Sequence, residues 1–175
     1  MKFFSLTLFI VIIISCAPIK VHYDYDQDLS FESYKTYQYY ADMNTGLSEL
    51  DTNRLLDAID DKMALKGYSI SETPDFFIDI KSKSFQEVQR SSVGIGMGGS
   101  GSNVGGGLSI GIPVGQSNTN TQIIIDFVDH SKKQLFWQAV SEFSFSPNLA
   151  PEMRERLFND VAEKVLSNYP PEKKK

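Results

Sequence analysis

Cysteine and histidine are scarce in this chain of 175 residues, which contains one cysteine and two histidines. A single cysteine excludes an internal disulfide framework and every metal site built from several thiolates. Two histidines leave little for acid–base chemistry or imidazole metal ligands, so most enzyme classes lose support. Positive charge is also in the minority, with 17 Lys and Arg against 22 Asp and Glu. The net charge of -5 argues against a protein that binds the phosphate backbone of nucleic acids.

The sequence does contain enough apolar residues for a folded domain. Hydrophobic residues make up 41% of the chain and charged residues 22%, a balance typical of globular proteins and not of disordered ones. The length fits one domain and is short for two. A domain of this size buries enough surface on folding to be stable without disulfides or metals.

The N-terminus has the pattern of a signal peptide. Residues 3–14 are apolar apart from one Ser and one Thr, and the run is too short for a permanent span, which needs about 20 residues. It fits the apolar region of a cleaved signal. Residues 13–16, Ile-Ile-Ser-Cys, resemble the bacterial lipobox, in which the cysteine receives a diacylglyceryl group. We therefore expect a lipoprotein signal peptide over residues 1–15.

Lipidation of Cys16 would explain why the chain has a single cysteine, because the modification needs a thiol nucleophile. The mature chain would begin with a lipidated tether over residues 16–20. Each buried acyl CH₂ contributes about 0.8 kcal/mol, so two or three chains anchor a domain firmly. In lipoproteins of this kind an Asp after the cysteine favours the inner membrane, whereas Ala17 stands here, so we expect the outer membrane, facing the periplasm. The alternative is that Cys16 is an apolar residue of an ordinary signal peptide or of a buried helix.

The first half of the mature chain predicts strands followed by a helix. Aromatic and β-branched residues are dense over residues 21–40, and residues 34–39 favour a half-buried strand. Ser48 followed by Asp51 resembles a capping box and predicts a helix start. Gly67 predicts its end, because glycine tolerates the left-handed conformation that closes a helix.

The predicted helix has two contrasting faces. Its apolar stripe consists of Leu55, Leu56, Ile59 and Met63. The other face carries Asp57, Asp60 and Asp61 beside Arg54 and Lys62. We expect this second face to be a solvated charged surface and not a set of catalytic carboxylates.

The second half of the chain predicts three strands and a helix. Alternation predicts a strand over residues 76–85, and residues 121–129 and 134–145 predict a hairpin. Trp137 lies on its second strand and is expected in the core. An amphipathic helix with a proline in its first turn is expected to begin near Asn148.

The resulting order is strand, strand, helix, strand, glycine-rich insert, strand, strand, helix. Since no regular βαβ alternation occurs, we expect an α+β domain. Its sheet is expected to be mostly antiparallel, with the two amphipathic helices packed on one face. Parallel pairings around the first helix remain open. The single domain is expected over residues 21–169, followed by a tail over residues 170–175.

The glycine-rich insert covers residues 93–115 and contains ten of the 12 glycines. Its apolar residues alternate with Gly, Ser or Pro, and this candidate interaction surface consists of Val93, Ile95, Met97, Leu108, Ile110, Ile112 and Val114. The period of two predicts a hairpin or flap with one apolar ridge and one bare backbone face. The alternative is a low-complexity loop, since glycine is costly to order.

Two active-site patterns occur in the insert, and both lack their structural context. Gly-x-Gly-x-x-Gly over residues 94–99 matches a dinucleotide-binding motif, but no amphipathic helix follows it. Ser109 is the centre of a Gly-x-Ser-x-Gly motif resembling a nucleophile elbow, but Pro113 stands where a helix should follow. His130 is the only downstream base. A serine hydrolase using Ser109 with His130 is retained as the alternative function.

Asp24, Asp26 and Asp28 resemble the opening of a calcium-binding loop, where alternate carboxylates supply oxygen ligands. The rest of that motif is absent. Leu29 occupies the position of the turn glycine, and Lys35 the position of the bidentate glutamate. We therefore expect the wet face of a strand and no metal site.

Several short motifs together resemble a known family. These are Asp24-Tyr25-Asp26, Phe31, Tyr34-Lys35-Thr36-Tyr37, Lys66-Gly67-Tyr68, Pro74-Asp75, Asp126-Phe127-Val128-Asp129 and Leu135-Phe136-Trp137. With the lipobox, they resemble the uncharacterised envelope lipoproteins of the domain of unknown function 4136 family. The resemblance covers roughly residues 21–169, and members often carry a glycine-rich insert before the final hairpin. It implies a lipid-anchored envelope domain, with no established activity or catalytic residues to carry over.

We therefore expect a lipoprotein of the cell envelope that acts as a non-enzymatic binding or structural module. Its partners are expected to be membrane lipid, through acylated Cys16, and an envelope protein or polymer, through the candidate interaction surface. No cofactor is expected.

Overall fold

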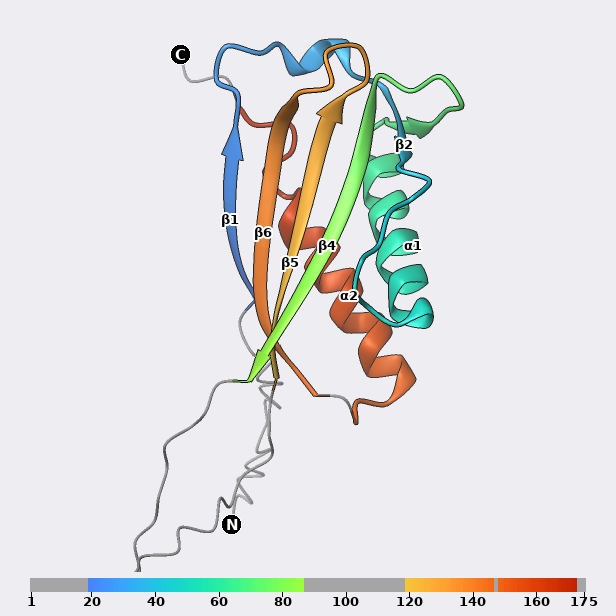
Figure 1. The fold of residues 1–175 in the computed structure, drawn as a ribbon, viewed down its shortest axis with the longest axis vertical. Coiled ribbons are helices and arrows are strands. Elements are labelled where there is room, and N and C mark those ends of the chain that lie inside the picture. The colour runs from blue at the N-terminus through green and yellow to red at the C-terminus, as the bar shows by residue number, and fades with distance from the viewer. Residues whose placement is uncertain (1–18, 87–118, 147, 173–175) are drawn as a thin grey trace, which may run out of the picture.

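The computed structural model describes residues 19–86, 119–146 and 148–172 of the chain. These residues form one six-stranded sheet with two α-helices on one of its faces (Figure 1). In chain order the elements are β1 (Lys20–Tyr25), a 3₁₀ turn (Phe31–Ser33), β2 (Thr36–Tyr39), α1 (Glu49–Leu65), β3 (Ser69–Ile70), β4 (Phe76–Gln86), β5 (Thr119–Asp129), β6 (Leu135–Phe145) and α2 (Pro151–Leu166). The expected α+β class, with two helices, is confirmed.

The sheet is mixed, so the expectation of a mostly antiparallel sheet is wrong. Its strand order is β1-β6-β5-β4-β2-β3. The first four strands of that order pair antiparallel, whereas β2 runs parallel to both β4 and β3. The cause is α1, because a helix that carries the chain back to the same end of a sheet connects parallel strands. The hairpin or flap predicted over residues 93–115 lies outside the described residues.

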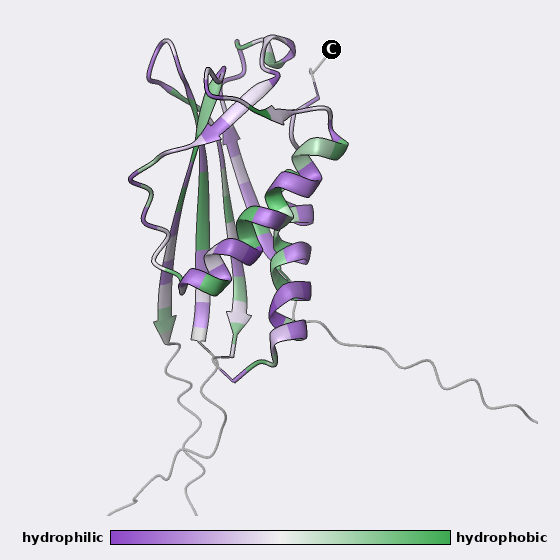
Figure 2. Cartoon of the chain, turned by 90° about the vertical axis from the view of Figure 1, so that its right-hand side faces the viewer, coloured by the Kyte–Doolittle hydropathy of each residue, from purple (hydrophilic) through white to green (hydrophobic). Residues whose placement is uncertain are grey.

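The long strands confirm the period of two in the sequence. Along β5, Ile123, Ile125 and Phe127 are fully buried, and the residues between them are partly exposed. The predicted hairpin is β5 and β6, which pair antiparallel. Figure 2 shows both helices to one side of the strands, with hydrophobic and hydrophilic turns alternating along them. One face of the sheet is therefore covered by α1 and α2, and the other face is open.

The caps predicted for the first helix are present. The Ser48 side chain accepts a hydrogen bond from the backbone N–H of Asp51 at 3.2 Å. Gly67 follows the helix with φ +84°, which a residue with a Cβ rarely adopts, and Tyr68 then folds back and is buried. The predicted stripe is buried at Leu55, at Ile59 and at Met63.

Aromatic rings fill the space between the sheet and the helices. The ring centroid of Phe127 lies 4.5 Å from that of Trp137 and 4.7 Å from that of Tyr169, the third residue after α2. Trp137 is 1% exposed, which confirms its expected place in the core. Because Tyr169 is also 1% exposed, the segment that follows α2 belongs to the core.

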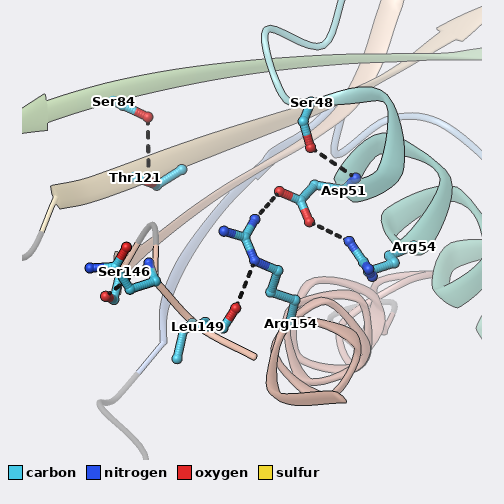
Figure 3. A network of polar contacts seen from close by, with 9 residues as sticks. Ser48, Asp51, Arg54, Ser84, Thr121, Ser146, Leu149 and Arg154 are labelled. Atoms are coloured by element: carbon cyan, nitrogen blue, oxygen red, sulfur yellow. Dashed lines mark hydrogen bonds and ion pairs between the residues drawn. The ribbon is translucent and has the colours of Figure 1, made fainter. Parts of the chain in front are cut away.

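A buried carboxylate joins the first turns of the two helices (Figure 3). Asp51 on α1 binds the guanidinium of Arg54 at 2.8 Å and that of Arg154 on α2 at 2.6 Å. Arg154 also donates a hydrogen bond from Nε to the carbonyl of Leu149, and its guanidinium lies 4.9 Å from the ring centroid of Phe145. Asp51 is 3% exposed, so its charge depends on these two cations and not on water.

Replacing Asp51 by Ala should lower the free energy of unfolding by about 3 kcal/mol, because Arg54 and Arg154 then both lose the buried carboxylate that they bind. Urea denaturation at neutral pH measures this. Asp57→Ala is the matched control, since Asp57 is exposed on the same helix and should change stability by less than about 0.5 kcal/mol. Equal effects of the two substitutions would contradict a stabilising role for the Asp51 contacts.

Candidate functional site

Cys16 and the candidate interaction surface, Val93 to Val114, lie outside the described residues. What the structure describes is where these segments attach to the sheet. The chain enters the domain at Ile19, which is 7% exposed, and begins β1 at Lys20. It leaves the sheet after Gln86 and returns at Thr119, which is the register partner of Gln86.

These attachment points lie at the same end of the sheet. Lys20 pairs in register with Glu142 of β6, and Glu142 pairs with Gln122 of β5. Gln122 in turn pairs with Lys83 of β4, three residues before that strand ends. The predicted lipid anchor and the glycine-rich insert therefore connect to one end of the domain, the lower end in Figure 1. In the sequence, Cys16 precedes Ile19 by three residues, and three extended residues span at most about 11 Å.

Asp75, from one of the motifs quoted above, holds two segments together at the opposite end. One of its carboxylate oxygens accepts hydrogen bonds from the backbone N–H groups of Lys35 and Thr36, both at 2.8 Å, and from the Thr36 hydroxyl at 2.9 Å. Burial by itself raises the pKa of this carboxyl, but the hydrogen bonds outweigh it and the pKa lies below its ordinary value. Asp75 thus fixes the start of β2 beside the start of β4.

Asp129, the last residue of β5, organises the turn of the hairpin. It accepts hydrogen bonds from the Tyr34 hydroxyl, from the Ser131 hydroxyl and from the N–H of Lys132, each at 2.7 Å. Burial raises its pKa, but these hydrogen bonds lower the pKa to about 2, so the group is ionised at neutral pH. A carboxylate with three donors is built to hold a turn and has little basicity left for proton transfer.

His130 lies in the same turn. Its Nδ1 donates a hydrogen bond to the carbonyl of Pro74 at 2.8 Å, and its backbone N–H donates to the carbonyl of Asp75 at 2.9 Å. The eleven residues of β5 separate this turn by about 30 Å from Thr119, where the insert returns to the sheet. Ser109 lies ten residues before Thr119, outside the described part, and those residues would have to run back along the sheet nearly fully extended to reach His130. This geometry weighs against the pair proposed for a serine hydrolase.

Asp60 does not belong to a solvated charged face, so that expectation is wrong for this residue. Its Oδ1 accepts hydrogen bonds from the hydroxyl of Tyr37 at 2.7 Å and from that of Tyr39 at 2.6 Å. Burial and these hydrogen bonds raise the pKa of both tyrosines well above the ordinary value. The three residues join α1 to β2. Asp57 and Asp61 are exposed, as expected.

The aspartates at positions 24, 26 and 28 do not come together as a calcium loop. Asp24 is exposed on β1, and Asp26 lies in the following turn, where it accepts the backbone N–H of Asp28 at 3.0 Å. A hollow of about 440 Å³ next to this turn is lined by both of these turn aspartates, by Glu172 and by apolar residues that include Phe31. Within the described ranges, no group of three or more His, Cys, Asp or Glu side chains is placed to hold a metal ion.

The partners of these aspartates lie at very different separations along the chain, so the sequence indicates some of these contacts better than others. Asp129 precedes a turn whose donors lie two and three residues later, a spacing typical of aspartate-stabilised turns. Asp75 could be suspected from its place before a strand, but its partners are 39 and 40 residues away. The pairing of Asp51 with Arg154 spans 103 residues, and nothing local indicates it.

Neither of the described helices is long and apolar enough to cross a membrane. A family model, described as a domain of unknown function (DUF4136), matches residues 21–171. No curated protein matches the sequence.

Solved structures with a similar fold are distant in sequence. A PDZ domain protein from Parabacteroides distasonis has a TM-score of 0.57 and 14% identity, and the match covers 90% of this chain but 36% of that one. The present chain thus spans about a third of that protein. Two structures of PelC from Paraburkholderia phytofirmans, one of them a point variant and both described as dodecamers, also have a similar fold. The variant has a TM-score of 0.51 and 9% identity, and the match covers 86% of this chain and 95% of that one. The other structure has a TM-score of 0.50 and 10% identity, with coverage of 86% and 96%. Identities this low show a shared fold and carry no function.

The stabilising effect of Tyr34 on Asp129 should depend on pH. The pKa of Asp129 is lowered, so its contribution is complete above the ordinary carboxyl value near 3.8 and is lost as the pH falls through about 2. The cost of Tyr34→Phe in unfolding free energy should therefore be about 1 kcal/mol larger at pH 7 than at pH 2. Denaturation at both pH values measures it. Tyr40→Phe, whose ring stacks on Phe77, is the control and should show no such difference.

Proposed function

The chain belongs to the family of the domain of unknown function DUF4136, whose model covers residues 21–171, and we propose that it is a lipid-anchored module of the cell envelope. In this proposal Cys16 carries the lipid, and the domain binds an envelope partner or supports an envelope structure without catalysing a reaction. The observation that carries the proposal is that β1 begins four residues after Cys16, at the end of the sheet where the glycine-rich insert is attached.

This arrangement would keep the insert close to the membrane that holds the anchor. Ile19 is buried, so only residues 17 and 18 separate the lipidated cysteine from the domain. The distance between the lipidated cysteine and Ile19 is then about 11 Å at most. The predicted apolar ridge from Val93 to Val114 would then meet partners close to the membrane surface. An envelope protein or polymer next to the membrane would be within its reach.

Charge supports a role for the lipid as the sole membrane attachment. Removal of the signal would remove Lys2 and leave the chain one unit more negative than the -5 of the full sequence. A domain with this charge is repelled by anionic lipid headgroups and gains no electrostatic binding from them. We propose the outer membrane, on the periplasmic side, as the location.

The proposed non-enzymatic role agrees with how the described carboxylates are used. Asp51, Asp60, Asp75 and Asp129 each accept hydrogen bonds or ion pairs from the fold itself. Their acceptor oxygens stabilise helix ends, a strand and a turn. A general base instead needs an oxygen that faces a substrate and a pKa near the working pH.

Mass spectrometry of protein extracted from membranes tests the anchor. The wild-type chain should begin at Cys16 and carry acyl mass, and Cys16→Ala should lose both the acyl mass and the cleavage after residue 15. Ser15→Ala keeps a small residue before the cysteine and should be processed like wild type. An unmodified wild-type chain in the soluble fraction would overturn the anchor.

Replacing the apolar residues of the candidate interaction surface by Ser should abolish cross-links to envelope components in intact cells, while leaving the thermal midpoint of the domain unchanged. The variant combines substitutions at Val93, Ile95, Met97, Leu108, Ile110, Ile112 and Val114. A control variant replaces Leu50, Leu65 and Met153, which are exposed apolar residues on the helices. Cross-links that survive the first variant would remove the insert from the binding role.

A further inference from the structure

The two edges of the sheet differ in how open they are. β3 forms one edge and is only two residues long, which leaves little backbone for another strand to pair with. β1 forms the other edge and pairs over all six residues with β6, without a bulge or a proline. Within the described ranges no strand lies on the outer side of β1 (Figure 1).

The direction of the free backbone groups on β1 follows from its pairing with β6. The N–H of Asp26 donates to the carbonyl of Phe136, the residue that continues the register. Residues two apart on a strand point their N–H and C=O groups the same way, so the even-numbered residues of β1 face β6. Val21, Tyr23 and Tyr25 therefore direct their N–H and C=O groups outward.

The side chains of these same residues fix the edge in position. Val21, Tyr23 and Tyr25 pack against the core. The hydroxyl of Tyr23 donates to the carbonyl of Lys164 on α2, and the ring centroid of Tyr25 lies 6.1 Å from that of Phe31. A strand held in this way loses little conformational freedom when a second strand pairs with it.

The exposed side chains of β1 have a self-complementary charge order. Lys20, His22 and Asp24 are exposed on the open face of the sheet, with a cation and an anion at equal distances on either side of the histidine. We propose that two copies of this chain pair antiparallel through β1, about a two-fold axis at His22. Lys20 then lies opposite Asp24 of the partner subunit, and the same pair recurs across the axis.

The outward N–H and C=O groups of β1 also support the register centred on His22. Val21 and Tyr23 of the two copies would exchange their outward N–H and C=O groups, since both point away from β6. His22 would face His22 of the partner subunit as a pair without mutual hydrogen bonds, for which the Cα separation is about 4.5 Å. A lysine on an edge strand usually opposes pairing with another strand, but in this register each Lys20 lies opposite Asp24 of the partner subunit.

A shift by two residues would place Lys20 opposite Asp26, and this register is less suitable. Asp26 has left the strand, and its carboxylate accepts the N–H of Asp28. The register centred on His22 uses only residues of β1.

The two-fold axis of the proposed dimer is perpendicular to the sheet. Two copies anchored in one membrane leaflet would therefore lie with their sheets parallel to the membrane. The pairing itself does not depend on the lipid anchor.

Disulfide cross-linking of the purified full-length chain tests the register. His22→Cys should form a dimer on mild oxidation, because Cα atoms about 4.5 Å apart are within disulfide range. Lys20→Cys and Asp24→Cys should each remain monomeric alone and cross-link only when the two variants are mixed. The wild type, whose only cysteine is Cys16, sets the background. If His22→Cys does not cross-link above this background, the proposal is overturned. Preferential cross-linking in a mixture of His22→Cys and Asp24→Cys would indicate the shifted register and would overturn it too.

Charge reversal provides an independent measurement by sedimentation equilibrium. Lys20→Asp should weaken dimerisation about tenfold or more, since it replaces two attractive pairs by two repulsive ones. The double variant Lys20→Asp/Asp24→Lys should restore it. Lys83→Asp is the matched control, because Lys83 is exposed on β4 and away from the β1 edge. A monomeric wild type, or equal weakening by Lys83→Asp, overturns the proposal.

Discussion

The structure depends on one constraint, which is that a single face of the sheet is covered by two helices. The largest buried side chains lie between the sheet and α1 and α2, and the helices also bind each other through Asp51 and Arg154 and through Lys62 and Glu163 at 2.9 Å. The open face must then be compatible with water. Its side chains pair locally, with Lys81 bound to Asp79 and with amide-to-carboxylate bonds from Gln122 to Glu142 and from Gln138 to Asp126.

Local signals in the sequence predicted local structure well. The Ser48 cap, the buried positions Leu55, Ile59 and Met63, and the hairpin of β5 and β6 follow from spacing and residue type alone. Parallel pairing around the first helix was left open by the sequence, because it depends on where α1 returns the chain and not on any pattern within β2. Asp60 was misjudged for a related reason, since its tyrosine partners lie on β2, more than 20 residues earlier.

The residues of the candidate site remain predictions from the sequence, and the structure adds the place where their segments attach to the sheet. Nothing local in the sequence indicates that the start of β1, the end of β4 and the start of β5 share one end of the sheet, because that follows from strand order. The motif residues Asp75 and Asp129 lie at the other end and stabilise backbone. The residues that maintain the fold are thus separated in space from the end of the domain to which the proposed functional segments attach.

The pairing of the first strand with the last also affects the order in which the chain can fold. Lys20 meets Glu142, and the core is completed only by Tyr169, close to the C-terminus. Contacts this far apart form late and slowly, since a long loop must close before any of them contributes. A nascent chain therefore cannot complete its core until Tyr169 has been synthesised. A protein that must cross a membrane before folding, as the proposed anchor requires, benefits from this delay, because the translocating chain stays unfolded until its last helix has arrived.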